Sequence, residues 1–471
     1  MQRRLRRSAA AALLLVPCGA AAATFDGAQL GVAWAIPFAG LLLSIALGPL
    51  IVPSFWHHHF GKIAAAWMLA FVIPFALLYG ADVTVEQVAH ALILEYVPFI
   101  LVLFGLYTVA GGICIHGSLH GSPGMNTALL GIGTLLASWM GTTGAAMLMI
   151  RSVIRANDNR EHKVHVIVFF IFLVANAGGA LTPLGDPPLF LGFLKGVDFF
   201  WTTKHLLAPT LVLCGILLAL FYAVDTYYFH RAGEQHEATL DPTPDTPLRV
   251  DGLVNLWFLA LIVGGVLLSG FWRPEISWTV LGSRIELQNV VRDVIIVVAA
   301  LLSIAFTRKE TRHRNHFTWG PIAEVAKLFI GIFITIIPVI AMLRAGVGGA
   351  FAPLVRLVTR PDGQPSDAMY FWLSGSLSSF LDNAPTYLVF FNMAGGDASV
   401  LMTTLASTLV AISAGSVFMG AMTYIGNAPN FMVKAIAEHR NIPMPSFFGY
   451  MGWSIAILVP AFLIVTVIFF R

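Results

Sequence analysis

Residues 184–190 read Leu-Gly-Asp-Pro-Pro-Leu-Phe, and residues 425–431 read Ile-Gly-Asn-Ala-Pro-Asn-Phe. Each stretch places a glycine, an acid or amide, and a proline inside a segment apolar enough to cross a bilayer. The two stretches match in order, with Gly185 and Gly426 lying 241 positions apart. Because glycine and proline interrupt helices, we expect each segment to form a helix that is broken near its middle.

The composition of the whole chain sets its class. Of the 471 residues, 58% are hydrophobic and only 11% are charged, which leaves too little polar surface for a soluble protein of this size. We therefore expect an all-α integral membrane protein with about ten transmembrane helices. The net charge of +3 gives no indication of a nucleic-acid partner, and the expected surroundings are the lipid bilayer.

Residues 1–23 have the composition of a targeting segment. Four arginines precede an Ala/Leu-rich run that ends in three alanines. This order predicts a signal peptide, and an uncleaved signal anchor is the alternative because the following segment is also apolar. Both place residue 24 on the outer face and predict a multi-pass protein of the bacterial inner membrane.

The apolar segments after the leader predict the course of the chain through the membrane. We expect ten spans, at residues 30–52, 63–80, 93–112, 164–200, 206–228, 253–272, 289–306, 320–342, 398–436 and 446–470. Segments 164–200 and 398–436 contain the two breaks and are predicted to be discontinuous helices. Segments 124–155 and 368–394 carry a polar kink at their middle and are predicted to be re-entrant helical hairpins.

The order of these segments predicts two repeats, at residues 24–228 and 253–471, joined by a cytoplasmic linker at 229–252. Loops assigned to the cytoplasm carry 13 Lys and Arg residues and those assigned outside carry 7. This fits the positive-inside rule only if both hairpins return to the face they entered, so the repeats are expected to be inverted. Asp225, Arg292 and Asp293 lie near the ends of their spans and are expected at the membrane interface.

In both halves the polar kink precedes the break by a similar distance. Aligning Thr142 with Asp382 places the breaks 43 and 44 residues further on, at Gly185 and Gly426. Breaks at membrane depth expose backbone carbonyls that can coordinate Na⁺ with side-chain oxygens, as in transporters. The candidate ligands for a cation or proton are Asp186, Asp382, Thr142, Thr143, Asn383 and Asn427.

Five further residues are predicted to shape the site: Gly185, Pro188, Gly426 and Pro429 at the breaks, and Asn176 before the first break. Asn176 is expected to form an interhelical hydrogen bond near the first break. Two carboxylates in a low-dielectric site are costly unless they are protonated or bind a cation, which favours exchange of Na⁺ or Li⁺ for H⁺. The alternatives are that both aspartates only cap helices and that the threonines only bond to backbone carbonyls.

The chain resembles the NhaD-type sodium/proton antiporters, within the ion transporter superfamily that also holds arsenite permeases and citrate or dicarboxylate carriers. The resembling stretches are 142–145, 151–157, 176–188, 381–386 and 426–430. The hairpin tips of carboxylate carriers in this superfamily commonly read Ser-Asn-Thr. Here the tips read Gly-Thr-Thr and Asp-Asn-Ala, which argues against an anionic substrate.

This resemblance implies a homodimeric secondary active transporter that exchanges Na⁺ (or Li⁺) for H⁺ by alternating access. Apart from the transported ions it implies no cofactor. The alternative function is a Na⁺-coupled citrate or dicarboxylate carrier, or an arsenite-type carrier. The chain contains neither His-Glu-x-x-His nor Gly-x-Ser-x-Gly, so we do not expect an enzyme.

Overall fold

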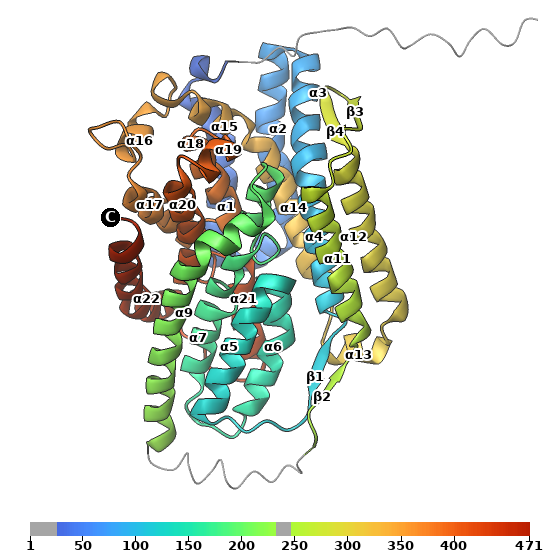
Figure 1. Ribbon diagram of the computed structural model, residues 1–471, viewed down its shortest axis with the longest axis vertical. Coiled ribbons are helices and arrows are strands. Elements are labelled where there is room, and N and C mark those ends of the chain that lie inside the picture. The colour runs from blue at the N-terminus through green and yellow to red at the C-terminus, as the bar shows by residue number, and fades with distance from the viewer. Residues whose placement is uncertain (1–25, 232–245) are drawn as a thin grey trace, which may run out of the picture.

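The protein is almost entirely helical in the computed structural model, which describes residues 26–231 and 246–471 (Figure 1). The predicted leader at 1–23 and the middle of the predicted linker, 232–245, lie outside the described residues. Within these residues, eight helices are long and apolar enough to cross a membrane. A ninth is added if α14 (Gly320–Thr335) and α15 (Ile337–Arg344), which bend by 43° between them, form one span. The predicted class of all-α membrane protein is thus confirmed.

The first half contains three long helical stretches, a helix pair, an interrupted helix and a further long helix. Its elements are η1 (Gly27–Gln29), η2 (Val32–Ala35), α1 (Ile36–Ile51), α2 (Pro53–Tyr79), α3 (Ala81–His90), the π-helical η3 (Ala91–Tyr96), α4 (Val97–Ala110), α5 (Pro123–Met140), α6 (Thr142–Ala156), α7 (Val164–Leu173), η4 (Ala177–Leu181), α8 (Pro187–Leu194) and α9 (Phe199–His230). The prediction started the second span at residue 63, whereas α2 starts at Pro53, because proline suits the first position of a helix.

The second half repeats this order. After α11 (Val254–Phe271), α12 (Leu287–Phe306), α13 (Lys309–Arg314), α14 and α15 come η5 (Gly346–Gly348), α16 (Ala352–Leu357), α17 (Asp367–Phe380), α18 (Asn383–Met393), α19 (Ala398–Met402), α20 (Ala406–Phe418), η6 (Met419–Met422), α21 (Ala428–His439) and α22 (Phe447–Phe469). The helix pairs α5–α6 and α17–α18 occupy the predicted hairpins. The apolar stretch Ala406–Met422 ends at the second break and is shorter than the uninterrupted spans.

Two short strand pairs, which the sequence did not predict, lie at opposite ends of the molecule (Figure 1). β1 (Cys114–His116) pairs antiparallel with β2 (Arg249–Asp251), which lies at the end of the predicted linker. β3 (Ser277–Val280) and β4 (Ser283–Glu286) form a hairpin between α11 and α12. Its turn residues Leu281 and Gly282 both have positive φ, as a tight two-residue turn requires.

The interrupted helices lie at the centre of the molecule. Helix α7 is apolar on all sides, and all but its first residue are buried. Around this centre the two halves interlock, because α18 packs against α8 and α6 packs against α21. Helices α4, α11 and α12 form a separate group along one side (Figure 1). This arrangement brings both breaks and both hairpin tips to one place.

Two charged residues near the ends of their helices are buried within the protein. Asp225 in α9 is 0% exposed and contacts Arg160 and His165, each at 2.7 Å. Arg292 in α12 is 2% exposed, and its Nε donates to Asp293 Oδ1 at 2.8 Å. Partners supplied by other segments or by the next residue offset the cost of burying these charges, and the expected position of both residues at the membrane interface stays a prediction.

Candidate functional site

The two breaks have the same backbone form. Thr182, after η4, has φ −137° and ψ 160°, and Thr423, after η6, has φ −136° and ψ 167°. Asp186 has φ −138° and ψ 143°, and Asn427 has φ −151° and ψ 139°. In each half the chain therefore leaves a short helix in extended conformation and re-enters a helix directly after an acid or amide.

Each break is tied to its own hairpin by the same hydrogen bonds. The Thr182 hydroxyl donates to the Ser138 carbonyl, and the Thr423 hydroxyl donates to the Ser379 carbonyl. In return, the Ser138 hydroxyl donates to the Gly178 carbonyl at 2.5 Å, and the Ser379 hydroxyl donates to Met419 O at 3.0 Å. All four serine and threonine side chains are buried, so these bonds hold each hairpin tip beside its break.

Glycine is required at both breaks by close backbone approach. A Cβ on Gly185 would lie 2.2 Å from the Gly179 carbonyl oxygen, and one on Gly426 would lie 2.6 Å from the Gly420 carbonyl oxygen. Each break is followed by a proline in the first turn of the next helix, Pro188 in α8 and Pro429 in α21. These contacts give a steric reason for the residues predicted to shape the breaks.

The structure shifts the alignment of the two hairpins by one residue. Helix α6 begins at Thr142 and α18 at Asn383, so Thr142 corresponds to Asn383 and not to Asp382 as the sequence alignment proposed. The position before α6 is Gly141, with φ +80°, and the position before α18 is Asp382. The first half therefore has no acid that corresponds to Asp382.

Asp186 lies at the point where both hairpins and both breaks meet. Its side chain is only 1% exposed. Oδ1 accepts hydrogen bonds from Thr142 Oγ1 at 2.9 Å and from Asn427 Nδ2 at 3.1 Å, and Oδ2 accepts one from Asn383 Nδ2 at 2.5 Å. Since Asp186 precedes α8 and its three donors begin α6, precede α21 and begin α18, four helix N-termini meet at this carboxyl group.

Only neutral donors contact the Asp186 carboxyl group. No Lys, Arg or His within residues 26–231 and 246–471 forms an ion pair with it. The four helix ends contribute partial positive charge, but Pro187 and Pro188 remove two backbone N–H groups from the start of α8 and Pro429 removes one from α21. The site offers hard oxygen ligands and few free backbone donors, which suits a proton or a small cation.

Asp382 has a different environment. Its side chain is partly exposed, and Oδ1 accepts a hydrogen bond from Ala384 N at 3.1 Å, which caps α18. No hydrogen bond joins Asp382 to Asp186 in the described part of the chain. The capping interpretation thus describes the Asp382 side chain, whereas the Asp186 side chain makes no capping bond to α8.

Two candidate ligands, Asn383 and Thr143, have side-chain oxygen atoms that accept no hydrogen bond among the residues described. Asn383 is fully buried and donates through Nδ2 to Asp186, while its Oδ1 has no hydrogen-bond partner among the residues described. Thr143 follows Thr142 at the start of α6 and is half-buried. An amide oxygen beside a buried carboxyl group is a ligand that hard cations accept.

Amide side chains extend the site across both breaks. Asn427 Nδ2 also lies 3.2 Å from Asn176 Oδ1, and Asn176 Nδ2 donates to Asn430 Oδ1 at 2.7 Å. Asn430 Nδ2 in turn donates to the carbonyl oxygens of Gly420 and Thr423. Asn430 was not among the predicted site residues. The sequence did offer a sign of its role, because the second break has a polar residue at this position and the first break has Leu189.

A multi-pass membrane protein whose two interrupted helices meet at a buried carboxyl group has the architecture of a secondary transporter. The chain belongs to the CitMHS_2 family, described as "Putative citrate transport", whose family model matches residues 27–470. No curated protein matches the chain. The match supports the predicted relationship to citrate carriers and does not single out the NhaD-type antiporters. A transport family also agrees with the expectation that the protein is not an enzyme.

Proposed function

We propose that this transporter couples its substrate to cations through Asp186, whose carboxyl group binds H⁺ and Na⁺ (or Li⁺) in turn. The observation that carries the proposal is a buried carboxyl group held by three neutral donors, with no cationic side chain of residues 26–231 and 246–471 in contact. An uncompensated buried charge costs several kcal/mol. The carboxyl group must therefore hold a proton or a metal cation, and competition between them couples the two fluxes.

The oxygen atoms around Asp186 are the proposed cation ligands. Thr142 and Asn427 position the carboxyl group, and Asn383 Oδ1 and the Thr143 hydroxyl are available to complete a coordination shell. Asp382, at the neighbouring helix start, is proposed as a second acid that takes part through its charge. The two repeats at 24–228 and 253–471 are proposed to open the site alternately to each side, in a homodimer of the inner membrane.

The first candidate function is exchange of Na⁺ or Li⁺ for H⁺, because the site offers a carboxyl group and neutral oxygens rather than cationic side chains. The second candidate is cation-coupled carriage of a citrate-like carboxylate, which the family match over residues 27–470 favours. In that case Na⁺ at Asp186 would offset the repulsion between this carboxyl group and the substrate. Both candidates need the same acid, so Asp186 alone does not separate them.

Transport in everted membrane vesicles from antiporter-deficient cells tests the first candidate. A pH-sensitive dye reports proton movement after addition of NaCl, LiCl, KCl or sodium citrate. Exchange predicts dequenching by Na⁺ or Li⁺ with either anion, lost in Asp186→Asn and kept in the surface control Asp251→Asn.

Uptake of labelled citrate into proteoliposomes tests the second candidate. Citrate uptake that needs Na⁺ or H⁺ and is lost in Asp186→Asn, without a response to NaCl alone, would replace the first candidate with the second. If neither assay gave a signal above empty vesicles, the proposed coupling at Asp186 would be wrong.

A further inference from the structure

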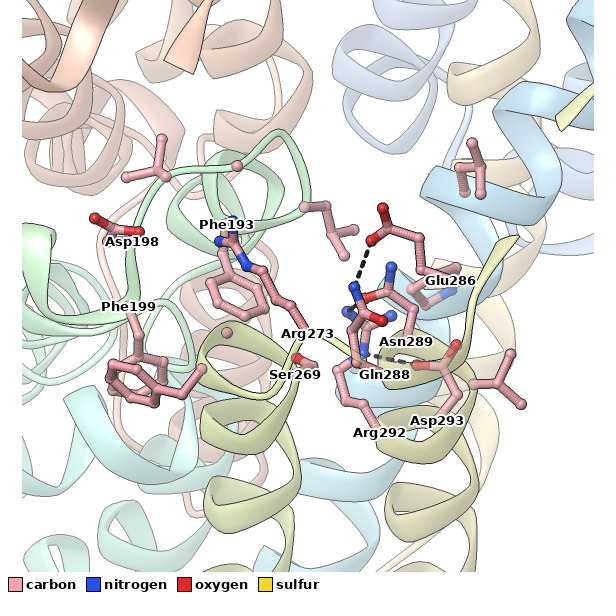
Figure 2. A pocket seen from close by; sticks show the side chains of 18 of the residues that line it. Phe193, Asp198, Phe199, Ser269, Arg273, Glu286, Gln288, Asn289, Arg292 and Asp293 are labelled. Carbon is pink, nitrogen blue, oxygen red and sulfur yellow. Dashed lines mark hydrogen bonds and ion pairs between the residues drawn. The ribbon is translucent and has the colours of Figure 1, made fainter. Parts of the chain in front are cut away.

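A large crevice lies apart from the Asp186 site. It has a volume of about 1380 Å³ and is bounded by α4, α11 and α12 on one side and by the α8–α9 segment and α19 on the other (Figure 2). Neither Asp186 nor its three hydrogen-bond donors line it. The proposed cation site therefore does not explain this crevice.

One end of the crevice is polar and carries both signs of charge. Arg273, Arg284 and Glu286 line it at the end of α11 and at the β3–β4 hairpin, and Asp198 and Lys204 line it at the start of α9 on the other side (Figure 2). Arg284 donates to the Ser277 hydroxyl, whereas Arg273 and Lys204 have no ion pair or side-chain hydrogen bond among the residues described. These residues flank the β3–β4 hairpin and the ends of α9 and α11, where a membrane surface is expected.

Polar side chains in the first turns of α12 form one wall of the crevice and are held in place by hydrogen bonds. Arg292 is buried, and its Nη1 donates to Asn289 Oδ1 at 3.0 Å while its Nε bonds to Asp293 (Figure 2). Gln288 is 6% exposed, and its Nε2 donates to Glu286 Oε2 at 2.6 Å. Gln288 Oε1 is buried and has no partner in the described part of the chain, so the wall presents an acceptor that lacks a donor.

The rest of the crevice is apolar and lies deeper along the same helix. Val294 and Val298 on α12 and Leu101 on α4 line this part. At 1.5 Å per residue, Val298 lies about 9 Å further along α12 than Arg292. A polar end followed by an apolar channel matches a molecule with a headgroup and a hydrocarbon chain.

The size of the crevice also favours a lipid. Pockets for drug-sized ligands are about 300–1,000 Å³, and this volume is larger. The polar end needs a ligand with both an anionic group, for Arg273, and an N–H donor, for Gln288 Oε1. A phospholipid with a primary ammonium headgroup has both groups and an apolar remainder.

We propose that the crevice binds one phosphatidylethanolamine-type lipid from the leaflet on the side of β3–β4. Its phosphate lies near Arg273 and its ammonium group donates to Gln288 Oε1, close to the Glu286 carboxylate. An acyl chain follows α12 past Val294 and Val298. This site is independent of the proposed transport function.

Native mass spectrometry of the purified protein in detergent, with a thermal-shift titration, tests the proposal. The probes are phosphatidylethanolamine, phosphatidylcholine and phosphatidylglycerol with the same acyl chains. Phosphatidylethanolamine should bind about tenfold more tightly than phosphatidylcholine, because only the former has N–H donors for Gln288 and the neighbouring carboxylate. Equal binding of these two lipids, or tighter binding of phosphatidylglycerol, would overturn the headgroup assignment.

Two headgroup variants separate the proposed contacts. Arg273→Gln should weaken both zwitterionic lipids by about tenfold, because it removes a charge-assisted bond to phosphate. Gln288→Leu should abolish the preference for phosphatidylethanolamine over phosphatidylcholine. The matched control Arg356→Gln, on the exposed surface of α16, should change neither value. Unchanged affinities in Arg273→Gln would contradict the phosphate contact.

A test of the apolar part does not depend on the headgroup residues. Val298→Trp should fill the channel and reduce lipid retention, whereas Leu301→Trp, on an exposed part of α12 outside the crevice, should not. Glycerophosphoethanolamine, which has the headgroup without acyl chains, should not compete at equal concentration. Competition by this soluble headgroup would show a small-molecule site and exclude the lipid.

Discussion

Asp186 and Asp225 are both buried aspartates of the first half, and they have opposite surroundings. Asp225 Oδ1 contacts Arg160 and His165, and its Oδ2 accepts a hydrogen bond from Asn126 Nδ2 at 2.9 Å. Asp186 has three hydrogen bonds as well, but all its donors are neutral. The difference is therefore the charge of the partners and not the number of hydrogen bonds.

This comparison indicates two uses of a buried acid. Around Asp225 the partners come from α5, α7 and the segment before α7, so the charge is matched within the protein and joins these elements to α9. Around Asp186 the described residues supply no cationic partner, and under the proposed function the matching charge is the transported proton or cation. A permanently paired acid holds the structure together, whereas an acid without a cationic partner can exchange ions.

Removal of the paired acid should have the largest effect on stability. We expect Asp225→Ala to lower the free energy of unfolding by about 3–5 kcal/mol, because buried Arg160 and His165 lose the carboxylate that contacts both. Chemical unfolding in detergent micelles measures this change. The control Asp251→Ala removes partly exposed ion pairs to Arg314 and His116 and should cost less than about 1 kcal/mol. Similar losses of unfolding free energy in the two variants would show that Asp225 is no more important for stability than a partly exposed ion pair.

Removal of the unpaired acid should act on transport instead. We expect Asp186→Asn to reduce cation-coupled transport by at least about 100-fold, because the amide binds neither a proton nor Na⁺ as a carboxyl group does. Its free energy of unfolding should stay within about 1 kcal/mol of the unmodified protein, because no buried cation loses its partner. A variant that unfolds like Asp225→Ala would assign Asp186 a structural role.

The second candidate acid should matter less. Asp382→Asn keeps an N-cap of equal quality for α18, so it removes the charge and leaves the cap in place. We expect about a tenfold loss of transport, from a charge that acts near Asp186 without bonding to it. Vesicle assays over a range of NaCl concentrations measure it. A loss as large as that of Asp186→Asn would place both acids at the coupling step, as the sequence first indicated.

The smallest effect is expected for a single neutral donor. Thr142→Val removes one hydrogen bond to Asp186 and keeps the shape of the side chain, which should weaken apparent Na⁺ affinity about threefold to tenfold. Thr142→Ser, which retains the hydroxyl, should restore most of the affinity. Equal behaviour of the valine and serine variants would show that this hydrogen bond does not position the carboxyl group.

Much of the fold could be predicted because its causes are local along the chain. Apolar runs set the spans, and Gly185 and Gly426 with the following prolines set the breaks. The prediction missed β1–β2 and β3–β4, which are too short to carry a pattern of their own. It also did not identify the partners of Arg292, because a sequence does not show that Asp293 and Asn289 accept its N–H groups in a buried position.

Several residues of the predicted site lie together in the structure, and their role in binding stays a prediction. Thr142, Asn383 and Asn427 donate hydrogen bonds to Asp186, whereas Asp382 caps α18. The predicted alignment of the two hairpins was wrong by one residue. Asn430 and the partners of Asp225 were not identified. In each of these cases the missing information was which side chain from a distant segment approaches the group.

The sequence by itself determined that this is a helical membrane protein with two matched helix breaks, because hydrophobicity and helix interruption depend on neighbouring residues. Only the tertiary structure decided that Asp186 meets neutral donors from three other helix starts, that Asp225 meets two cations, and that a mixed-charge crevice opens beside α12. Those outcomes depend on where segments far apart in the chain come together, and the packing of the two interlocked halves sets that arrangement.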